Sequence, residues 1–337
     1  MSKPDWSKLS LNYMETPYRF ISYYKNGVWD DGVLSTGNSV VLSEAACVLQ
    51  YAQTCFEGLK AFTSSKGNIV VFRPDMNAKR FKDTLKRLVM PEYPENKFIE
   101  AVLKTVKATS DYVPPYGINA ALYIRPFMIG TSPVINVIPS NEYEFRVFTT
   151  PLGSYFKNDS SMKLLVGDYD RAAPHGTGNV KAGLNYAMSF YASHTAKEKG
   201  YNECMYLDAS SRKYVEETGT ANIIFVDKEG TLVVPFSKSI LPSITRKSLI
   251  YIAKEYLNIK VEERPVEVNE LQNFSECGLC GTAAVISPVG SVDIPGSHVE
   301  FKDSLCGRGP VLEKLYKTYT AIQKEEIPAP EGWLYKV

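Results

Sequence analysis

The chain has little of what marks several common classes of protein. Its 337 residues carry 38 basic and 37 acidic side chains, so the formal net charge of +1 gives no field that favours nucleic acid or an anionic membrane. No apolar stretch approaches the roughly 18 residues that a membrane-spanning helix needs. The amino-terminal residues lack the apolar core of a signal peptide, and there is no repeat or low-complexity tract. We expect a cytoplasmic protein that binds neither nucleic acid nor membrane.

Histidine and cysteine are also scarce. The three histidines are His175, His194 and His298, and the chain has one Cys-x-x-Cys pair, Cys277 and Cys280, without a second. That set does not make a zinc site, so no metal is predicted. Six cysteines in so long a chain do not form the dense pattern of a disulfide scaffold. Because free cysteine is usually buried, we interpret the Cys277 and Cys280 pair as buried strand residues with reduced thiols.

The hydrophobic pattern predicts alternating strands and helices. Asn26-Gly27 after the first strand is typical of a tight hairpin turn. Strands with interspersed helices indicate an α+β architecture rather than a doubly wound parallel sheet. The predicted strands include 18–24, 59–62, 68–72, 120–125 and 144–148, and the predicted helices are at about 76–88, 184–199, 245–257 and 309–324.

The length and one change in composition predict two domains. The segment 151–161 is polar and rich in turn-forming residues, which is typical of a domain boundary. We therefore expect a smaller N-terminal α/β domain at 1–152, an interdomain loop at 153–162 and a larger C-terminal domain at 163–337.

Lys181 carries the strongest chemical signal. Glycines surround it in the sequence His-Gly-Thr-Gly-Asn-Val-Lys-Ala-Gly, residues 175–183, and they leave backbone space around a long amine. An enzyme that uses pyridoxal phosphate needs a lysine that holds the aldehyde and later moves a proton. Tyr186, five residues further on, is suited to donate a hydrogen bond to the phenolic oxygen of that cofactor. Alone, Lys181 would be read as a solvated lysine and Tyr186 as a packed aromatic residue.

A carboxylate follows at a suitable distance along the chain. Glu217 lies just before the apolar strand that begins at Asn222. A fixed carboxylate there would keep a pyridine nitrogen protonated, which lets the ring accept electrons. Glu216 is adjacent and would point to the opposite face of an extended segment. We expect one of the two to be solvated and choose Glu217 as the buried residue.

Three further segments offer phosphate ligands. Ser243, Ile244 and Thr245 precede an amphipathic helix, and the first amides of a helix favour anions. Thr282 adds a hydroxyl within the compact Gly-Thr-Ala turn at 281–283. Arg80, on the early helix, is one of several candidates for the cation. An ordinary capped helix and a solvated arginine remain the alternatives at each place taken alone.

Taken together, these motifs resemble those of the branched-chain amino acid aminotransferases. That family has the D-alanine-aminotransferase-like fold, which is fold type IV of the pyridoxal phosphate enzymes. The resemblance runs from about Tyr51 to Trp333. It rests on Phe-Glu-Gly-Leu-Lys-Ala-Phe at 56–62, Phe-Arg-Pro at 72–74 with Asn77 and Arg80, Tyr-Ile-Arg-Pro at 123–126, Gly-Asn-Val-Lys at 178–181 and the segments described above.

The resemblance implies a role for each candidate residue. Lys181 would be the catalytic Schiff-base lysine, Tyr186 would hold the phenolic oxygen, and Glu217 would pair with the ring nitrogen. The phosphate would be bound by Arg80, the amides of Ile244 and Thr245, and Thr282. The substrate α-carboxylate would meet Tyr51 and the backbone around Thr282 and Ala283. The side-chain pocket would be lined by Phe56, Tyr123 and Tyr155, with Arg125 placed to receive the distal carboxylate of glutamate.

The implied reaction is reversible ping-pong transamination. L-Leucine, L-isoleucine and L-valine would react with 2-oxoglutarate to give branched-chain 2-oxo acids and L-glutamate. An apolar wall with one cation at its rim suits both kinds of substrate. The resemblance also implies a homodimer in which the partner supplies part of the site walls.

Two alternative functions remain open. A D-amino acid aminotransferase or an aminodeoxychorismate lyase of the same fold would keep Lys181 and Glu217. A non-catalytic protein that binds a phosphate ligand at Ser243 would leave Lys181 unexplained.

Mammalian members of the family carry a redox-active cysteine pair after the Gly-Thr-Ala turn, but Ala284 and Ser287 stand at those positions here. The resemblance therefore does not imply that redox switch.

Overall fold

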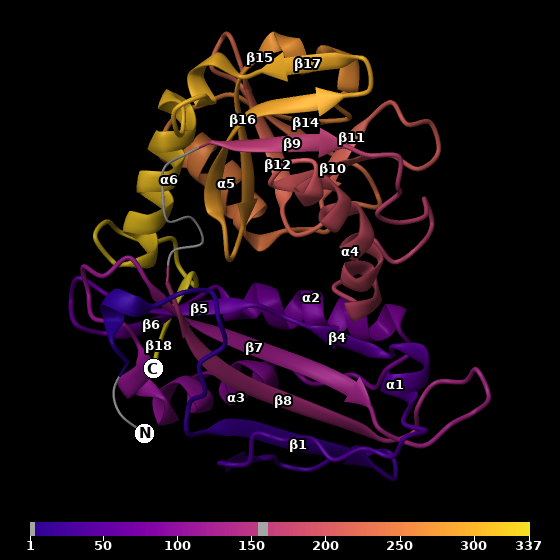
Figure 1. The fold of residues 1–337 in the computed structure, drawn as a ribbon. Coiled ribbons are helices and arrows are strands. Elements are labelled where there is room, and N and C mark those ends of the chain that lie inside the picture. Colours follow the sequence, from indigo (N-terminus) through magenta and orange to yellow (C-terminus); the bar gives the residue numbers. More distant parts are fainter. Residues whose placement is uncertain (1–3, 154–160) are drawn as a thin grey trace. The chain divides into compact units, whose positions relative to one another are not determined.

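The structure is a computed structural model that describes residues 4–153 and 161–337, and it comprises two compact units (Figure 1). Unit 1 contains Met1–Tyr155, Val180–Leu184 and Ala321–Val337, and unit 2 contains Phe156–Asn179 and Asn185–Thr320. Most of the loop predicted at 153–162 lies outside the described residues. The short segment that carries Lys181 belongs to unit 1, although its neighbours on both sides belong to unit 2. The predicted α+β architecture is confirmed.

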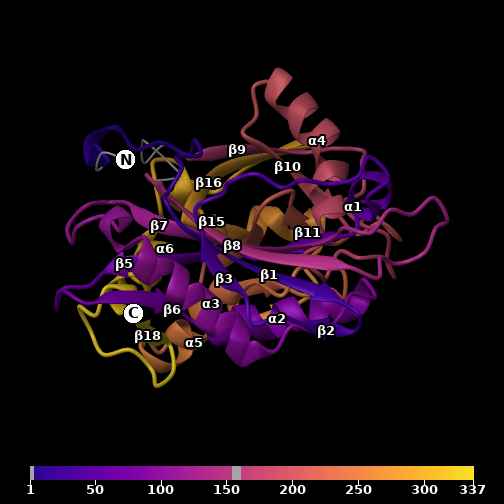
Figure 2. The ribbon, with the colours of Figure 1, turned by 90° about the horizontal axis from the view of Figure 1, so that it is seen from below.

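Unit 1 is built on a mainly antiparallel sheet. Its strand order is β18-β6-β5-β7-β8-β1-β2, with β3 paired to β1 and β4 paired to β7. Figure 2 shows β7, β8 and β1 running side by side. The elements of this unit are β1 (Arg19–Lys25), β2 (Val28–Trp29), β3 (Val33–Ser35), α1 (Cys47–Tyr51), β4 (Thr54–Phe56), β5 (Leu59–Thr63), β6 (Ile69–Phe72), α2 (Pro74–Arg87), α3 (Glu95–Ala108), β7 (Ala121–Gly130), β8 (Tyr143–Leu152) and β18 (Leu334–Lys336).

The hairpin between β1 and β2 forms as predicted. Asn26 and Gly27 have φ angles of 52° and 83°, which a two-residue hairpin turn of the primed type requires. Helix α2 matches the helix predicted at about 76–88. Helix α3 was not predicted, although Phe98, Val102 and Val106 recur on one face at helical spacing and are buried.

The two faces of the unit 1 sheet differ in composition. Helices α2 and α3 contact the sheet, and their apolar residues share one core with Leu122, Ile124 and Met128 of β7 and with Phe145 and Val147 of β8. Side chains alternate along a strand, so the intervening residues of β7 and β8 lie on the opposite face. That open face carries Tyr123, Arg125, Phe127, Arg146 and Phe148.

Unit 2 contains a sheet whose order is β11-β10-β9-β16-β15-β12-β13-β14. Strand β11 also pairs with β12, which closes a ring through β10, β9, β16 and β15, and β17 pairs with β16. Its strands are β9 (Met162–Val166), β10 (Glu203–Leu207), β11 (Val215–Thr218), β12 (Asn222–Asp227), β13 (Leu232–Pro235), β14 (Val261–Arg264), β15 (Phe274–Gly281), β16 (Val285–Ile294) and β17 (Ser297–Glu300).

Three helices accompany this sheet. They are α4 (Gly183–Glu198), α5 (Ile244–Glu255) and α6 (Pro310–Gln323), close to the positions predicted for them. Cys277 and Cys280 are buried free cysteines on β15, which confirms their interpretation as buried strand residues. Burial raises the pKa of Cys280 to about 12, so this thiol stays protonated at neutral pH. Within residues 4–153 and 161–337, no helix has the length and apolar character to cross a membrane.

Candidate active site

Lys181 is fixed through its backbone. Its amide donates a hydrogen bond to Thr84 Oγ1 of α2 at 3.1 Å, and its carbonyl accepts one from the Phe56 amide at 3.2 Å. The next residue, Ala182, forms a β-bridge with Cys55 of β4. These contacts hold the Cα of Lys181 at the end of β4 and leave the conformation of its long side chain to other groups. The half-buried amine lies 4.6 Å from the centre of the Phe56 ring.

Phe56 and Tyr123 bring two cations together in unit 1. The Arg125 guanidinium carbon lies 4.5 Å from the Phe56 ring centre and 5.2 Å from that of Tyr123. Arg125 Nη2 also donates to the Tyr123 hydroxyl at 2.9 Å. A Cβ on Gly58 would come closer than 3.0 Å to that hydroxyl, so glycine is needed there. The Phe56 ring is thus contacted by both Lys181 and Arg125.

Arg125 carries an incomplete set of hydrogen bonds. Its Nε is buried and has no hydrogen-bond partner in the part of the chain that the structure describes. Lys60 of β5 is the register partner of Tyr123, and burial lowers the pKa of Lys60 to about 8. Sequence reasoning missed Lys60 as a member of this face. A signal was available, because Lys60 interrupts the apolar run 59–62 and so places a charged side chain on a mostly apolar strand.

Arg80 is buried rather than solvated. Its Nε and Nη2 each lie 2.7 Å from an oxygen of Glu57, and Asn77 Nδ2 donates to the same carboxylate at 2.7 Å. Glu57 is fully buried, so this ion pair forms part of the interior of unit 1. The role of Arg80 as a phosphate ligand stays a prediction.

Tyr51 and Tyr155 are two further residues of the predicted substrate site. The exposed Tyr51 ends α1, and its hydroxyl donates to the carbonyl of Ile135 in the loop between β7 and β8. Tyr155 lies outside the described residues. The contact of Tyr51 with the α-carboxylate remains a prediction.

In unit 2, Glu217 is held by three donors. Arg171 Nη2 lies 2.8 Å from Oε1, and the Leu241 amide donates to the same oxygen at 2.7 Å. Asn222 Nδ2 donates to Oε2 at 2.6 Å. Burial raises the pKa of Glu217, while Arg171 and the Leu241 amide act in the opposite direction. The carboxylate is thus buried, fixed in orientation and paired with a positive charge.

Arg171 is a functional candidate that sequence reasoning missed. It is 6% exposed and also donates to the carbonyls of Gly178 and Ser239. A Cβ on Gly178 would lie 2.6 Å from Arg171 Nη2 and closer still to the Ser239 carbonyl. The glycine therefore makes room for the arginine, which joins the glycine-rich segment to Glu217. An arginine beside Ala-Ala-Pro at 172–174 and just before glycines was the available signal.

The expectation that one of the adjacent glutamates is solvated was wrong. Glu216 and Glu217 are each 3% exposed. Ser237 Oγ donates to Glu216 at 2.8 Å, and Ser239 Oγ donates to the same oxygen. The physical reason is that all four residues of β11 are buried, so both of its faces are covered and both carboxylates need buried partners.

The predicted phosphate residues of unit 2 lie at a buried helix start. Helix α5 begins at Ile244 after Ser243, whose side chain accepts a hydrogen bond from the Arg246 amide at 3.2 Å. Ser243, Ile244 and Thr245 are 7%, 6% and 2% exposed. The first amides of a helix have no partner within the helix, and burial also removes water from them. A buried helix start of this kind suits an anion.

Thr282, Ala283 and Tyr186 lie at the edges of elements. Thr282 and Ala283 are half-buried in the turn between β15 and β16. Val285, which follows that turn, has a φ angle of 56°, a conformation that β-branched residues rarely adopt. Such strain is often found at functional turns. Tyr186 is half-buried in the first turn of α4.

The residues present fit pyridoxal phosphate in their chemistry. Unit 1 offers the amine of Lys181 on an aromatic ring. Unit 2 offers the buried carboxylate of Glu217 and the buried helix start at Ile244. Unit 1 also carries the under-bonded guanidinium of Arg125, which suits a substrate carboxylate. These are the groups that a Schiff base, a pyridinium nitrogen, a phosphate and an anionic substrate need.

Comparisons with known proteins cover the whole chain. The sequence profile of the amino-transferase class IV family matches residues 54–292. The branched-chain-amino-acid aminotransferase of Helicobacter pylori is 43% identical over 336 residues, which are 99% of this chain and 98% of that protein. The enzyme of the same name from Haemophilus influenzae is 44% identical over 343 residues and covers 100% of both chains.

A solved structure has the same fold. The branched-chain amino acid aminotransferase of Thermobaculum terrenum, in its PLP form, matches with a TM-score of 0.80 and 24% identity. The match covers 96% of this chain and 99% of that one. The similarity therefore extends over both units and supports the two-domain fold predicted from the sequence.

Proposed function

Because the chain belongs to the amino-transferase class IV family, we propose that it transfers amino groups reversibly between branched-chain amino acids and 2-oxoglutarate with pyridoxal phosphate as cofactor. The substrates would be L-leucine, L-isoleucine and L-valine, and the products L-glutamate and the branched-chain 2-oxo acids. The observation that carries the proposal is the Phe56 ring shared by the amine of Lys181 and the guanidinium of Arg125. An amine and a guanidinium against one aromatic ring are what a nucleophile and an anion-binding group on one apolar wall would need.

Each catalytic residue has a task that its surroundings support. When bound, the cofactor supplies an electron sink for negative charge at the substrate α-carbon. Lys181 would hold the cofactor through Nζ, and its freed amine would take the proton from that carbon. Glu217 would keep the ring nitrogen protonated, and Arg171 favours the ionised form of Glu217 that this task needs.

The substrate wall suits two kinds of side chain. Phe56 and Tyr123 provide the apolar surface that a leucine, isoleucine or valine side chain would cover. Arg125 lies against both rings and has an unpartnered Nε among the described residues. The distal carboxylate of glutamate would be received by this guanidinium. A pocket with one fixed cation therefore serves both half-reactions.

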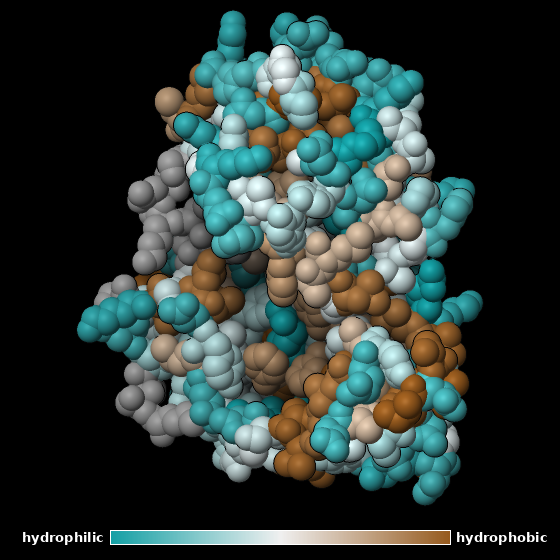
Figure 3. All heavy atoms as spheres, turned by 45° about the vertical axis from the view of Figure 1, so that its right-hand side comes forward, coloured by the Kyte–Doolittle hydropathy of each residue, from teal (hydrophilic) through white to brown (hydrophobic). Residues whose placement is uncertain are grey.

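We also propose a homodimer that works in the cytoplasm. Ile135 and Val137, in the loop between β7 and β8, are 78% and 84% exposed. Figure 3 shows hydrophobic side chains at the surface among polar ones. Large exposed apolar side chains gathered in a loop favour burial by another protein surface. The free buried cysteines are compatible with a reducing compartment.

The test is steady-state kinetics with 2-oxoglutarate and either L-leucine or D-alanine as amino donor. Turnover with L-leucine and none with D-alanine is expected. The reverse preference would support a D-amino acid aminotransferase. Arg125→Gln should raise KM for 2-oxoglutarate about tenfold or more and change KM for L-leucine much less, because leucine has no distal carboxylate. An equal change for both substrates would remove the assigned role of Arg125.

A further inference from the structure

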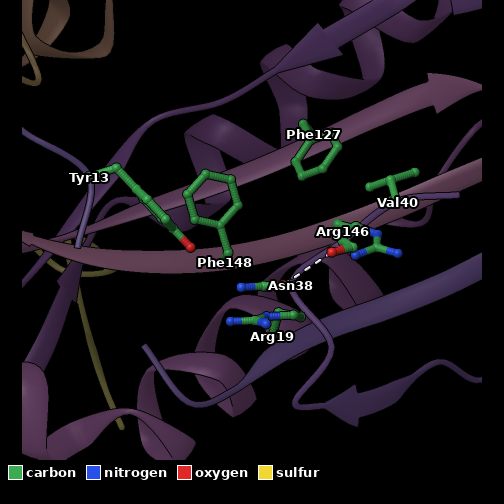
Figure 4. A pocket seen from close by; sticks show the side chains of 8 residues that line it. Tyr13, Arg19, Asn38, Val40, Phe127, Arg146 and Phe148 are labelled. Atoms are coloured by element: carbon green, nitrogen blue, oxygen red, sulfur yellow. Dashed lines mark hydrogen bonds between the residues drawn. The ribbon is translucent and has the colours of Figure 1, made fainter. Parts of the chain in front are cut away.

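A separate pocket opens on the same face of the unit 1 sheet. Its volume is about 440 Å³, and Figure 4 shows the side chains around it. The pocket lies next to the substrate wall, because Phe148 is the register partner of Arg125 and Phe127 is two residues further along β7. None of its residues belongs to the predicted substrate site. They are Tyr13, Arg19, Asn38, Ser39, Val40, Phe127, Arg146 and Phe148.

One side of this pocket is apolar. The rings of Phe127 and Phe148 meet edge to face with centroids 6.1 Å apart, and Tyr13 packs against Phe148 at 5.9 Å. Both phenylalanines are half-buried, so each leaves part of its ring uncovered. Val40 adds an aliphatic side chain from the segment that borders the pocket. An apolar body placed here would cover these surfaces.

The other side carries two buried guanidinium groups. Arg146 is 7% exposed, and in the part of the chain that the structure describes its only hydrogen-bond acceptor is Glu144, which accepts from Nε. Its Nη donors remain for another acceptor. Arg19 is 3% exposed and donates through Nη1 to the Thr36 carbonyl at 2.8 Å and through Nη2 to the Thr16 carbonyl at 2.7 Å.

The positive charges exceed the negative charge that is buried with them. Glu144 balances Arg146, but the acceptors of Arg19 are neutral carbonyls. The carboxylate near Arg19 is Glu15, which is 4.0 Å away and 36% exposed. A buried positive charge without a buried partner is costly, so an anion in the pocket would stabilise it. Arginine is also well suited to bind a planar carboxylate through two parallel hydrogen bonds.

We propose that this pocket binds a small organic carboxylate whose apolar body lies against Phe127 and Phe148 and whose carboxylate is held by Arg146 and Arg19. A bare inorganic anion would leave the aromatic surface uncovered, and a neutral apolar molecule would leave the charge of Arg19 unbalanced. The volume lies within the range of small-molecule pockets. The inference rests on the pocket alone and does not depend on the proposed transamination.

The probe for the test is 3-phenylpropanoate, a carboxylate with no amino or oxo group that transamination could use. Isothermal titration of the full-length protein loaded with pyridoxal phosphate should show saturable binding. The double variant Glu144→Gln/Arg146→Met removes both charges of the ion pair, so no buried charge is left alone, and it should bind at least about tenfold more weakly. Val40→Trp, which puts a larger side chain in the lining of the pocket and keeps both arginines, should weaken binding to a similar degree.

Two controls identify the site and the role of charge. Arg125→Gln should leave the affinity for 3-phenylpropanoate within about twofold, because Arg125 does not line the pocket. The neutral analogue 3-phenylpropanamide should bind at least about tenfold more weakly than the acid. The proposal is overturned by an absence of saturable binding in the wild-type protein. Binding that survives both pocket changes and is lost in Arg125→Gln would also overturn it, because the probe would then occupy the substrate wall.

Discussion

Lys181 and Glu217 are held in opposite ways. The backbone of Lys181 is fixed by Thr84 and Phe56, whereas its amine rests against an aromatic ring. Glu217 is fixed through its side chain, because Arg171, Asn222 and the Leu241 amide all donate to its carboxylate. The position of the Lys181 Cα is therefore fixed, whereas for Glu217 it is the position of the carboxylate that is fixed.

The difference matches the work that each residue is proposed to do. A lysine that binds a cofactor and then carries a proton must change the position of its amine, so a fixed backbone with an adaptable side chain suits it. A carboxylate that keeps a ring nitrogen protonated has to stay in one place, and rigid support from neighbouring groups achieves that. The predictions below break one type of support at a time, from the largest expected effect to the smallest.

The largest effect is expected for Lys181→Ala. The change removes the amine but keeps the backbone contacts with Thr84 and Phe56, so the fold should remain intact. Transamination of L-leucine should fall at least about 10⁴-fold, because both the covalent attachment and the proton transfer are lost. Steady-state kinetics measures this loss, and circular dichroism checks the fold. Turnover close to that of the wild type would refute the assignment.

Arg171→Met should have the next largest effect. It leaves the buried carboxylate of Glu217 without its charged partner, and the free energy of unfolding should fall by roughly 3–5 kcal/mol. The pKa of Glu217 should rise further, so the acid limb of the pH–rate profile should move to higher pH. The destabilisation should grow as pH rises above the unfolded value of about 4.3, since the folded state then keeps a proton that the unfolded state has lost.

A matched control separates charge from packing at this position. In Glu217→Gln/Arg171→Met no charge is left alone, so urea unfolding should show a smaller destabilisation than for Arg171→Met. An equal destabilisation of the single and double variants would mean that Arg171 acts by packing and not by supporting the carboxylate.

Gly178→Ala tests how tightly the backbone at Gly178 packs against Arg171, the ion-pair partner of Glu217. The added methyl group would lie 2.6 Å from Arg171 Nη2 and would also meet the Ser239 carbonyl, so it should destabilise unit 2 by about 1–3 kcal/mol. Gly281→Ala is the control, because nothing lies within 4 Å of a Cβ built there. Thermal unfolding of both variants gives the comparison. Equal melting temperatures would show that the segment at Gly178 moves aside without cost.

The smallest effect is expected at Lys60, which is the register partner of Tyr123 in the unit 1 sheet. Burial lowers the pKa of Lys60 to about 8, whereas its value in the unfolded chain is about 10.4. Between these two pH values the unfolded state binds more protons than the folded state, so the free energy of unfolding rises with pH. Lys60→Met lacks this group and should be more stable than the wild type at pH 7 by about 1 kcal/mol, because the lysine is only partly buried and solvent offsets much of the cost of its charge. The difference should shrink as pH approaches 10. Urea unfolding at both pH values tests it, and a constant difference would contradict the lowered pKa.

Much of the fold followed from local patterns. The Asn26-Gly27 turn was predictable because few other residue pairs accept positive φ at two successive positions. Helix α5 was predictable from the apolar stripe that includes Leu249 and Ile252. Helix α3 was not predicted even though Phe98, Val102 and Val106 recur at helical spacing, so the signal was present in the sequence. Periodicity was the better guide there.

The candidate site was less accessible to sequence reasoning. Lys181 and Glu217 stand out by residue type and by their neighbours in the chain. Arg171 does not, because its partner Glu217 is far away in sequence and meets it only after the strands pair. Glu216 was judged solvated because alternation along a strand normally exposes one face. Both faces of β11 are covered in the structure, so that rule fails here, and the hydroxyls of Ser237 and Ser239 satisfy the second carboxylate.

The most direct test of the account is the absorbance of the purified protein after addition of pyridoxal phosphate, followed by L-leucine. The account predicts a band above about 400 nm that falls as a band at shorter wavelength rises, with no such change in Lys181→Ala. A band that ignores L-leucine but responds to D-alanine would contradict the proposed substrate. The absence of any such band in the wild-type protein would contradict the assignment of Lys181 itself.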